Sequence, residues 1–180
     1  IRTPEIVDWL EQKMESNKNS MPLSIDKKRR ILSKLNEAVA FESFLHTKFV
    51  GQKRFSLEGC ETLIPALDEV IECGAEMGIK EFVIGMSHRG RLNVLANILG
   101  KTYKEIFTEF EGLEYDEHEF SGDVKYHLGF STDVKTSTGK DIHLSVAPNP
   151  SHLEAVDPVV QGIVRSKIDN TVGGTEDQIA

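Results

Sequence analysis

The stretch EFVIGMSHRGRLNVLAN, residues 81–97, decides the fold of this chain. It begins with the apolar run Phe82–Ile84, which is short and uninterrupted, as expected of a strand buried on both faces. Over Arg91–Leu99 the apolar residues return at helical spacing, and Gly100 ends that pattern. The order of strand, turn and helix predicts one unit of an α/β sheet, with the turn Gly85–Arg91 at the end of its strand.

Helical spacing continues on both sides of this unit. It predicts helices over residues 3–16, 24–49, 63–77, 103–110 and from 153 onward, with Pro158 expected to kink or restart the last one. Residues 142–146 alternate apolar and polar side chains, which is typical of a strand with one face toward a core. We expect an α/β fold with a helical N-terminal segment, residues 1–57, followed by an α/β domain with a mainly parallel sheet, residues 58–180.

Composition narrows the class of function. The chain has 21 Lys and Arg residues against 29 Asp and Glu residues, a net charge of −8, which argues against nucleic-acid binding. It lacks an apolar run of the roughly 18 residues that a membrane span requires. Cys60 and Cys73 form neither a disulfide framework nor a zinc motif. A soluble intracellular protein is therefore expected.

The turn Gly85–Arg91 is the first candidate for a ligand site, because open α/β sheets usually bind ligands where a strand leads into a helix. Arg89 and Arg91 lie at the start of the following helix, where the helix dipole is already positive. A bound phosphate or carboxylate would compensate that charge. The alternative is an arginine paired with a nearby glutamate at a surface turn.

Two further segments could contribute to the same site. Gly122–Gly129 combines His127 with glycines, and Asn149–Glu154 opens a helix whose first N–H groups could bind an anion. A structural histidine and a helix capped by Ser151 are the simpler interpretations of these two segments. If all three segments lie at one edge of the sheet, they would form a convergent anion site.

Histidines also raise the question of a metal site. Five of the six stand at positions 88, 118, 127, 143 and 152, but no two of these five have the spacing of zinc ligands on one element, and no cysteine accompanies them. We therefore expect no metal site within this chain.

Four segments carry a resemblance to a known family. In order along the chain they are FSLEGCE at 55–61, GMSHRGRLNVLAN at 85–97, residues 122–129 and residues 149–158. They resemble the first component of 2-oxoglutarate dehydrogenase, and the resemblance covers roughly residues 30–169. It implies a thiamine-diphosphate-binding α/β domain and an enzyme of the tricarboxylic acid cycle that decarboxylates 2-oxoglutarate. That enzyme is a homodimer that passes succinyl to the lipoyl group of dihydrolipoyl succinyltransferase, in a complex with dihydrolipoyl dehydrogenase.

The resemblance also implies roles for particular residues. His88 and His127 match catalytic positions that recognise the substrate, and Arg89 matches a position that contacts both cofactor and substrate. Ser151 matches a position that binds both as well, while Leu153 and Asn149 match positions that line the cofactor. Arg91 is interpreted as structural.

One departure from the family concerns magnesium. The family holds the cofactor's diphosphate through Mg²⁺ bound by a Gly-Asp motif and a later asparagine pair, and neither occurs between Arg165 and Ala180. We therefore expect a truncated domain that is inactive by itself. We also expect a bacterial cytoplasm rather than a mitochondrial matrix. The 2-oxoadipate enzyme and a noncatalytic module that binds an anion or a protein are the alternatives.

Overall fold

The structure is a computed structural model that describes residues 3–18, 20, 22–111, 127–148 and 152–170. The chain forms two compact units, Ile1–Leu32 and Ser33–Ala180. A compact unit is not the same as a domain, so the expected domain boundary after residue 57 stays a prediction. None of the helices in the described ranges is long and apolar enough to cross a membrane.

The first unit contains helix α1 (Pro4–Asn17) and the start of α2 (Ile25–Lys48). Both helices were predicted from their spacing. The Ser24 hydroxyl caps α2 by accepting the backbone N–H of Lys27 at 3.2 Å. No described residue of α1 is buried, and the side chains of Ile6, Trp9 and Met14 are about half exposed. The apolar stripe of α1 therefore adds no buried core within this unit.

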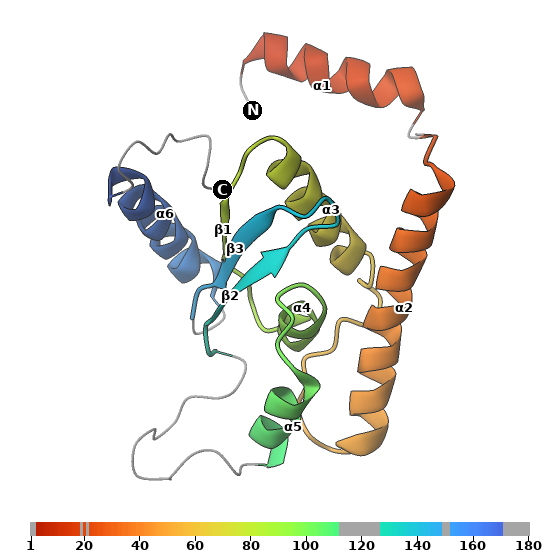
Figure 1. Ribbon diagram of the computed structural model, residues 1–180, viewed down its shortest axis with the longest axis vertical. Helices are drawn as coiled ribbons and strands as arrows, with labels where there is room; N and C mark the ends of the chain where they lie inside the picture. Colours follow the sequence, from red (N-terminus) through yellow and green to blue (C-terminus); the bar gives the residue numbers. More distant parts are fainter. Residues whose placement is uncertain (1–2, 19, 21, 112–126, 149–151, 171–180) are drawn as a thin grey trace. The chain divides into compact units, whose positions relative to one another are not determined.

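A three-stranded sheet lies at the centre of the second unit (Figure 1). Strand β3 (Asp141–Val146) lies between β1 (Glu81–Ile84) and β2 (Phe130–Lys135). It pairs parallel with β1 and antiparallel with β2. The expectation of a mainly parallel sheet is thus wrong for the described strands, because β2 and β3 form a hairpin and need no helical crossover.

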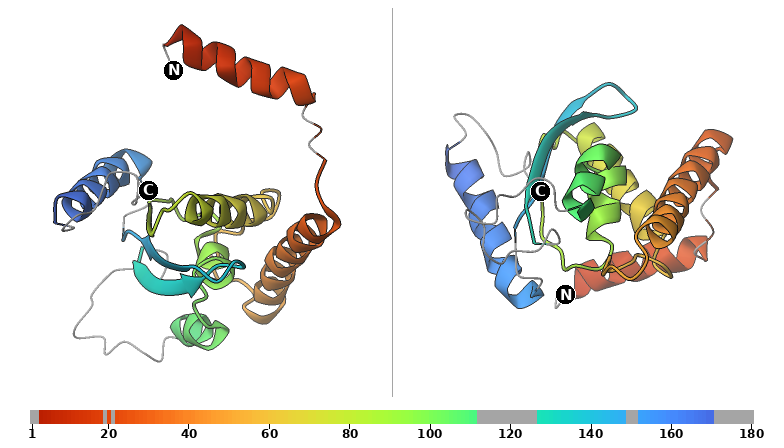
Figure 2. Two further views of the ribbon diagram at one scale, coloured as in Figure 1. Left: turned by 45° about the horizontal axis from the view of Figure 1, so that its top comes forward. Right: turned by 90° about the horizontal axis from the view of Figure 1, so that it is seen from below.

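Helices cover both faces of this sheet, as the right-hand view of Figure 2 shows. Helices α3 (Leu63–Glu76) and α4 (Arg91–Asn97) lie on one side, and α6 (Leu153–Asn170) lies on the other. Helix α5 (Tyr103–Glu111) follows α4 along the chain. All four were predicted, but α6 runs through Pro158 as one helix and does not restart there.

The core of the second unit follows from the alternation in β3. Ile142, Leu144 and Val146 are buried against α3 and α4, while His143 and Ser145 point to the opposite face. A second apolar cluster joins the later part of α2 to α4 and α5; its buried members are Phe41, Leu45, Phe49, Leu92, Leu95 and Ile106. The clusters include Val146 and pack against Ile84 and Phe130, the strand-end residues beside the candidate site.

Candidate functional site

The strand register brings the predicted loops to one edge of the sheet. Ile84, the last residue of β1, pairs with Val146, the last residue of β3, and Phe130 at the start of β2 pairs with the same Val146. The turn after β1, the segment before β2 and the segment after β3 therefore leave from the same edge. Asn149 and Ser151 lie outside the described residues.

His88 and His127 meet at this edge. Their ring centroids are 5.1 Å apart, with the planes tilted by 37°. Burial lowers the pKa of His88, and electrostatic repulsion from the neighbouring basic groups of His127, His152, Arg91 and Lys53 lowers it further. The His88 ring is therefore neutral at pH 7, so that one ring nitrogen can donate a hydrogen bond and the other can accept one.

Arg89 lies at the outer side of the turn and is exposed. Its Nη1 donates to the backbone carbonyl of Ser56 at 3.0 Å. Among the described residues this contact, and not an ion pair with glutamate, is the one that anchors Arg89. A guanidinium carries five N–H donors, so Arg89 retains donors for a ligand.

Arg91 has the opposite orientation and is fully buried. Its Nη2 donates to the carbonyls of Leu128 at 2.6 Å and Ala147 at 2.8 Å, and its Nη1 donates to that of Met86 at 3.2 Å. These three carbonyls belong to the three segments that leave the sheet edge. Arg91 therefore ties the segments together, in agreement with its interpretation as structural.

Gly90 connects the turn to the segment before α3. Its φ of +75° is left-handed, and a Cβ there would lie 2.5 Å from Leu57 Cδ1. Its backbone N–H donates to the carbonyl of Phe55 at 2.9 Å. The Phe55 ring stacks on His88, with centroids 4.4 Å apart and planes within 16° of parallel. The turn and residues 54–57 thus pack as one layer.

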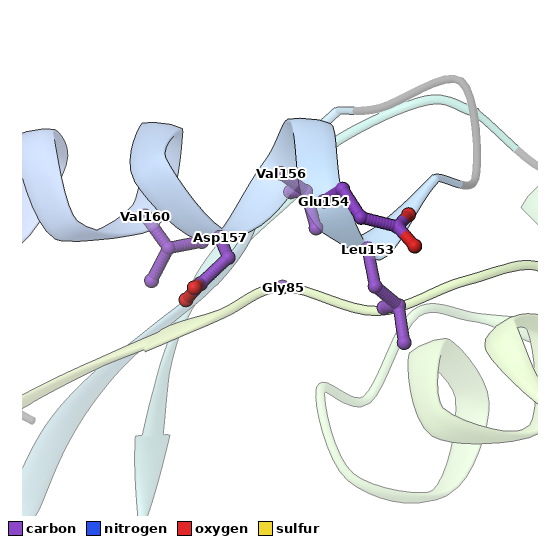
Figure 3. Close-up of a pocket in the computed structure, with 6 residues that line it drawn as sticks. All are labelled: Gly85, Leu153, Glu154, Val156, Asp157 and Val160. Carbon is purple, nitrogen blue, oxygen red and sulfur yellow. The ribbon is translucent and has the colours of Figure 1, made fainter.

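Leu153 lies on the other side of the edge, at the start of α6, and is about half exposed. It lines a pocket of about 480 Å³ with Gly85, Glu154, Val156, Asp157 and Val160. Figure 3 shows Leu153 and Asp157 directed from α6 toward the segment that holds Gly85. A Cβ on Gly85 would lie 2.9 Å from Val160 Cγ2, so glycine permits this close approach.

Metal ligation has no support within the described ranges, where no group of three or more His, Cys, Asp or Glu side chains could hold an ion. His143 instead lies on the face of β3 opposite α3 and α4, and it hydrogen-bonds Asp133 and Ser131. His118 lies outside the described residues.

The sequence singled out His88, His127, Arg89 and Leu153, whose roles stay predictions, but it missed three features of the candidate site. It gave no role to Phe55, because nothing in the sequence marks an aromatic residue for a left-handed conformation (φ +44°). It also missed the approach of His152 to His88 and the role of Glu42. The buried carboxylate of Glu42 accepts the backbone N–H of Leu57 at 3.0 Å.

Comparisons with known proteins bear on this geometry. No family model matches the chain. It is 57% identical over 171 residues to the multifunctional 2-oxoglutarate metabolism enzyme of Mycolicibacterium vanbaalenii, a match that covers 94% of this chain and 14% of the relative. It is 48% identical over 181 aligned positions to the 2-oxoglutarate dehydrogenase E1 components of Brucella canis and Brucella melitensis, covering 99% of this chain and 18% of each relative.

The chain spans less than a fifth of the length of these curated relatives. The alignments nevertheless extend over 94–99% of the chain. The chain is therefore homologous, over nearly its whole length, to one segment of the E1 component of 2-oxoglutarate dehydrogenase.

Proposed function

We propose that this chain forms part of a thiamine-diphosphate-dependent enzyme that decarboxylates 2-oxoglutarate, and that its sheet edge helps to bind the substrate. The observation that carries the proposal is the pairing of His88 and His127, 5.1 Å apart, beside the exposed Arg89. The relatives named for 2-oxoglutarate dehydrogenase support the choice of substrate.

The electrostatics of the edge suit an anionic substrate. Burial is the largest cause of the lowered His88 pKa, and the cations Arg91 and Lys53 lower it further. These two cations would favour a carboxylate at that place. 2-Oxoglutarate carries two carboxylates and a keto oxygen, all of which accept hydrogen bonds. Imidazole N–H groups of His88 and His127 and the guanidinium of Arg89 are suitable donors for these three groups.

The cofactor fits the described residues only in part. The pocket between Gly85 and α6 has an apolar lining from Leu153, Val156 and Val160, which suits the packing of an aromatic ring. When bound, thiamine diphosphate supplies the electron sink for decarboxylation. Arg89 and Leu153 would contact the cofactor, and Ser151 and Asn149 keep their proposed roles from the resemblance. Ligands for Mg²⁺ would come from outside the described residues.

The proposal extends to the oligomeric state and the partners of the whole enzyme. We assign it a homodimer that works with dihydrolipoyl succinyltransferase and dihydrolipoyl dehydrogenase, as the resemblance implies. The bacterial relatives favour a bacterial cytoplasm.

The test uses the protein as its gene encodes it, with Mg²⁺ and thiamine diphosphate. Calorimetry measures cofactor binding, and release of carbon dioxide measures turnover with 2-oxoglutarate and, separately, with 2-oxoadipate. In His127→Ala we expect cofactor affinity to persist and turnover to fall by about 10²-fold or more, because a positioned donor is lost. His143→Ala is the matched control, since His143 bonds Asp133 and Ser131 on the face of the sheet opposite α3 and α4. It should keep full turnover.

Two results would contradict the proposal. If the wild-type protein neither binds the cofactor nor releases carbon dioxide, the chain belongs to a noncatalytic module. If 2-oxoadipate is turned over faster than 2-oxoglutarate, the substrate assignment is wrong while the chemistry stands.

A further inference from the structure

Phe55 is held in an unusual backbone conformation next to His88. Its φ is +44°, a region that side-chain-bearing residues other than Asn and Asp rarely adopt. Such a conformation persists only where surrounding contacts enforce it. The stacked arrangement with His88, at 4.4 Å between ring centroids, is the contact that this conformation produces on the side of the candidate site.

The enforcing contacts converge on one buried carboxylate, that of Glu42 in α2, which is 3% exposed. Its Oε2 accepts the Arg54 guanidinium at 2.8 Å, and its Oε1 accepts the Leu57 N–H at 3.0 Å. These two residues flank Phe55 along the chain. Oε1 also accepts the side-chain amide of Asn93 in α4 at 3.1 Å, so the carboxylate that holds the segment 54–57 is itself bonded to a second helix.

The same segment is bonded to the turn that holds the site residues. The Phe55 carbonyl accepts the Gly90 N–H at 2.9 Å, and the Ser56 carbonyl accepts the Arg89 guanidinium at 3.0 Å. His88 immediately precedes these two residues. A path of direct contacts therefore runs from Glu42 through residues 54–57 to His88 and Arg89.

We infer that Phe55 is a positioning residue that fixes the plane of the His88 ring toward His127, and that the buried Glu42 carboxylate holds Phe55 in place. This inference rests on the proposed function of His88 in substrate recognition. The role is one of orientation, because a ring stacked on one face of an imidazole limits its rotation and leaves its edge nitrogens for other partners.

The protonation of His88 gives a second consequence of the stacking. The Phe55 ring excludes water from one face of the imidazole, and burial is the largest cause of the lowered His88 pKa. The groups that face His88 from other elements are His127, His152, Arg91 and Lys53, and all four lower that pKa in the same direction. Removal of the Phe55 ring should therefore raise it, while these charges stay in place.

Phe55→Gly isolates the ring from the backbone. Glycine adopts positive φ without strain, so the carbonyl bond to Gly90 should persist while the stacking is lost. Phe55→Tyr keeps the ring and is the conservative rescue. Phe44→Leu is the control for loss of a partly exposed aromatic elsewhere, since Phe44 stacks on Phe107 at 5.0 Å and lines a pocket with Phe41 and Tyr103.

The measurement is deuterium exchange at the imidazole C2 position, followed by mass spectrometry of the peptide that contains His88 over a range of pH, in the protein as encoded. We expect the His88 pKa to rise in Phe55→Gly and in Glu42→Gln, and to match wild type in Phe55→Tyr and Phe44→Leu. In turnover assays Phe55→Gly should raise KM for 2-oxoglutarate about two- to tenfold without changing cofactor affinity.

An unchanged His88 pKa in Phe55→Gly overturns the inference, and so does an equal rise in Phe44→Leu. A rise in Phe55→Gly but not in Glu42→Gln removes Glu42 from the role. The exchange measurement needs no turnover. A wild-type protein without decarboxylase activity would therefore refute the proposed function separately, and would leave the coupling between Phe55 and His88 measured on its own.

Discussion

His143 lies on strand β3, and His88 lies in the turn that follows the neighbouring strand β1. The two histidines have different kinds of partner. In His143 both ring nitrogens have partners on β2: Nδ1 lies 2.7 Å from an Asp133 carboxylate oxygen, and Nε2 lies 2.8 Å from the Ser131 hydroxyl. His88 stacks on Phe55 and faces His127, with further positive charge around it. The first histidine joins two strands, whereas the second stands where an incoming anion would be stabilised.

The difference follows from where each residue lies relative to the strands. His143 is paired directly opposite Asp133 in the antiparallel ladder, so its acidic partner is built into the register. His88 follows the last residue of β1 by four positions, in a turn where the partners come from other segments. The register thus gives His143 its partners, whereas the partners of His88 depend on how other segments pack against the turn.

The largest expected effect comes from breaking the edge itself. Arg91→Leu leaves the carbonyls of Met86, Leu128 and Ala147 buried without their donor, and should lower the free energy of unfolding by about 3–5 kcal/mol. Chemical denaturation measures this. Arg165→Leu, which removes a mostly exposed pair with Asp169 on α6, should cost less than about 1 kcal/mol. Equal losses in the two variants would show that Arg91 does not tie the segments together.

A smaller effect should come from crowding the layer beside His88. Gly90→Ala and Gly100→Ala both place a side chain at a positive φ, +75° and +70°, which costs about 1–2 kcal/mol in each case. Only at Gly90 does the new Cβ meet a neighbour, Leu57 Cδ1 at 2.5 Å; at Gly100 nothing lies within 4 Å. Gly90→Ala should therefore be the less stable variant by roughly a further 1 kcal/mol. Denaturation curves in which the two variants coincide would remove the packing argument.

The smallest expected effect is on the pH dependence of the free energy of unfolding, and it concerns His88. Because the His88 pKa is lowered in the folded protein, the unfolded state binds a proton more readily, with a pKa of about 6.5. The stability linked to neutral His88 is therefore present above that value and is lost as pH falls toward the folded pKa. His88→Gln should flatten this part of the stability profile. Profiles with the same slope in wild type and His88→Gln would contradict the lowered pKa.

Much of the fold could be predicted because burial leaves a periodic signal. The long stripe of α2, the uninterrupted run of β1 and the alternation in β3 each match one packing environment. Strand β2 was missed although Phe130, Thr132 and Val134 also alternate with polar residues. Its inward face is only partly buried and includes a threonine, so the apolar pattern is weak, and without β2 the antiparallel pairing could not be foreseen.

The candidate site was predictable in its location but not in its inner contacts. The end of β1 was identified because a strand leading into a helix marks a sheet edge. The helix-dipole argument treats Arg89 and Arg91 alike, and only the resemblance separates them, yet one is exposed and the other is fully buried. The left-handed Gly90 between them turns the chain, and the phase of α4 then directs Arg91 inward. Such orientation depends on tertiary contacts that neither spacing nor charge encodes.

The exposure of α1 has a practical result for spectroscopy. Trp9 is the single tryptophan of the chain, it is 55% exposed, and its ring has Lys13 Nζ at 5.5 Å from the centroid. Because it lies in the unit Ile1–Leu32, its emission reports on the surroundings of α1 and is a poor reporter of the sheet. An unfolding curve recorded at tryptophan wavelengths could stay flat while β1, β2 and β3 separate. Far-ultraviolet circular dichroism is the signal that follows the sheet unit.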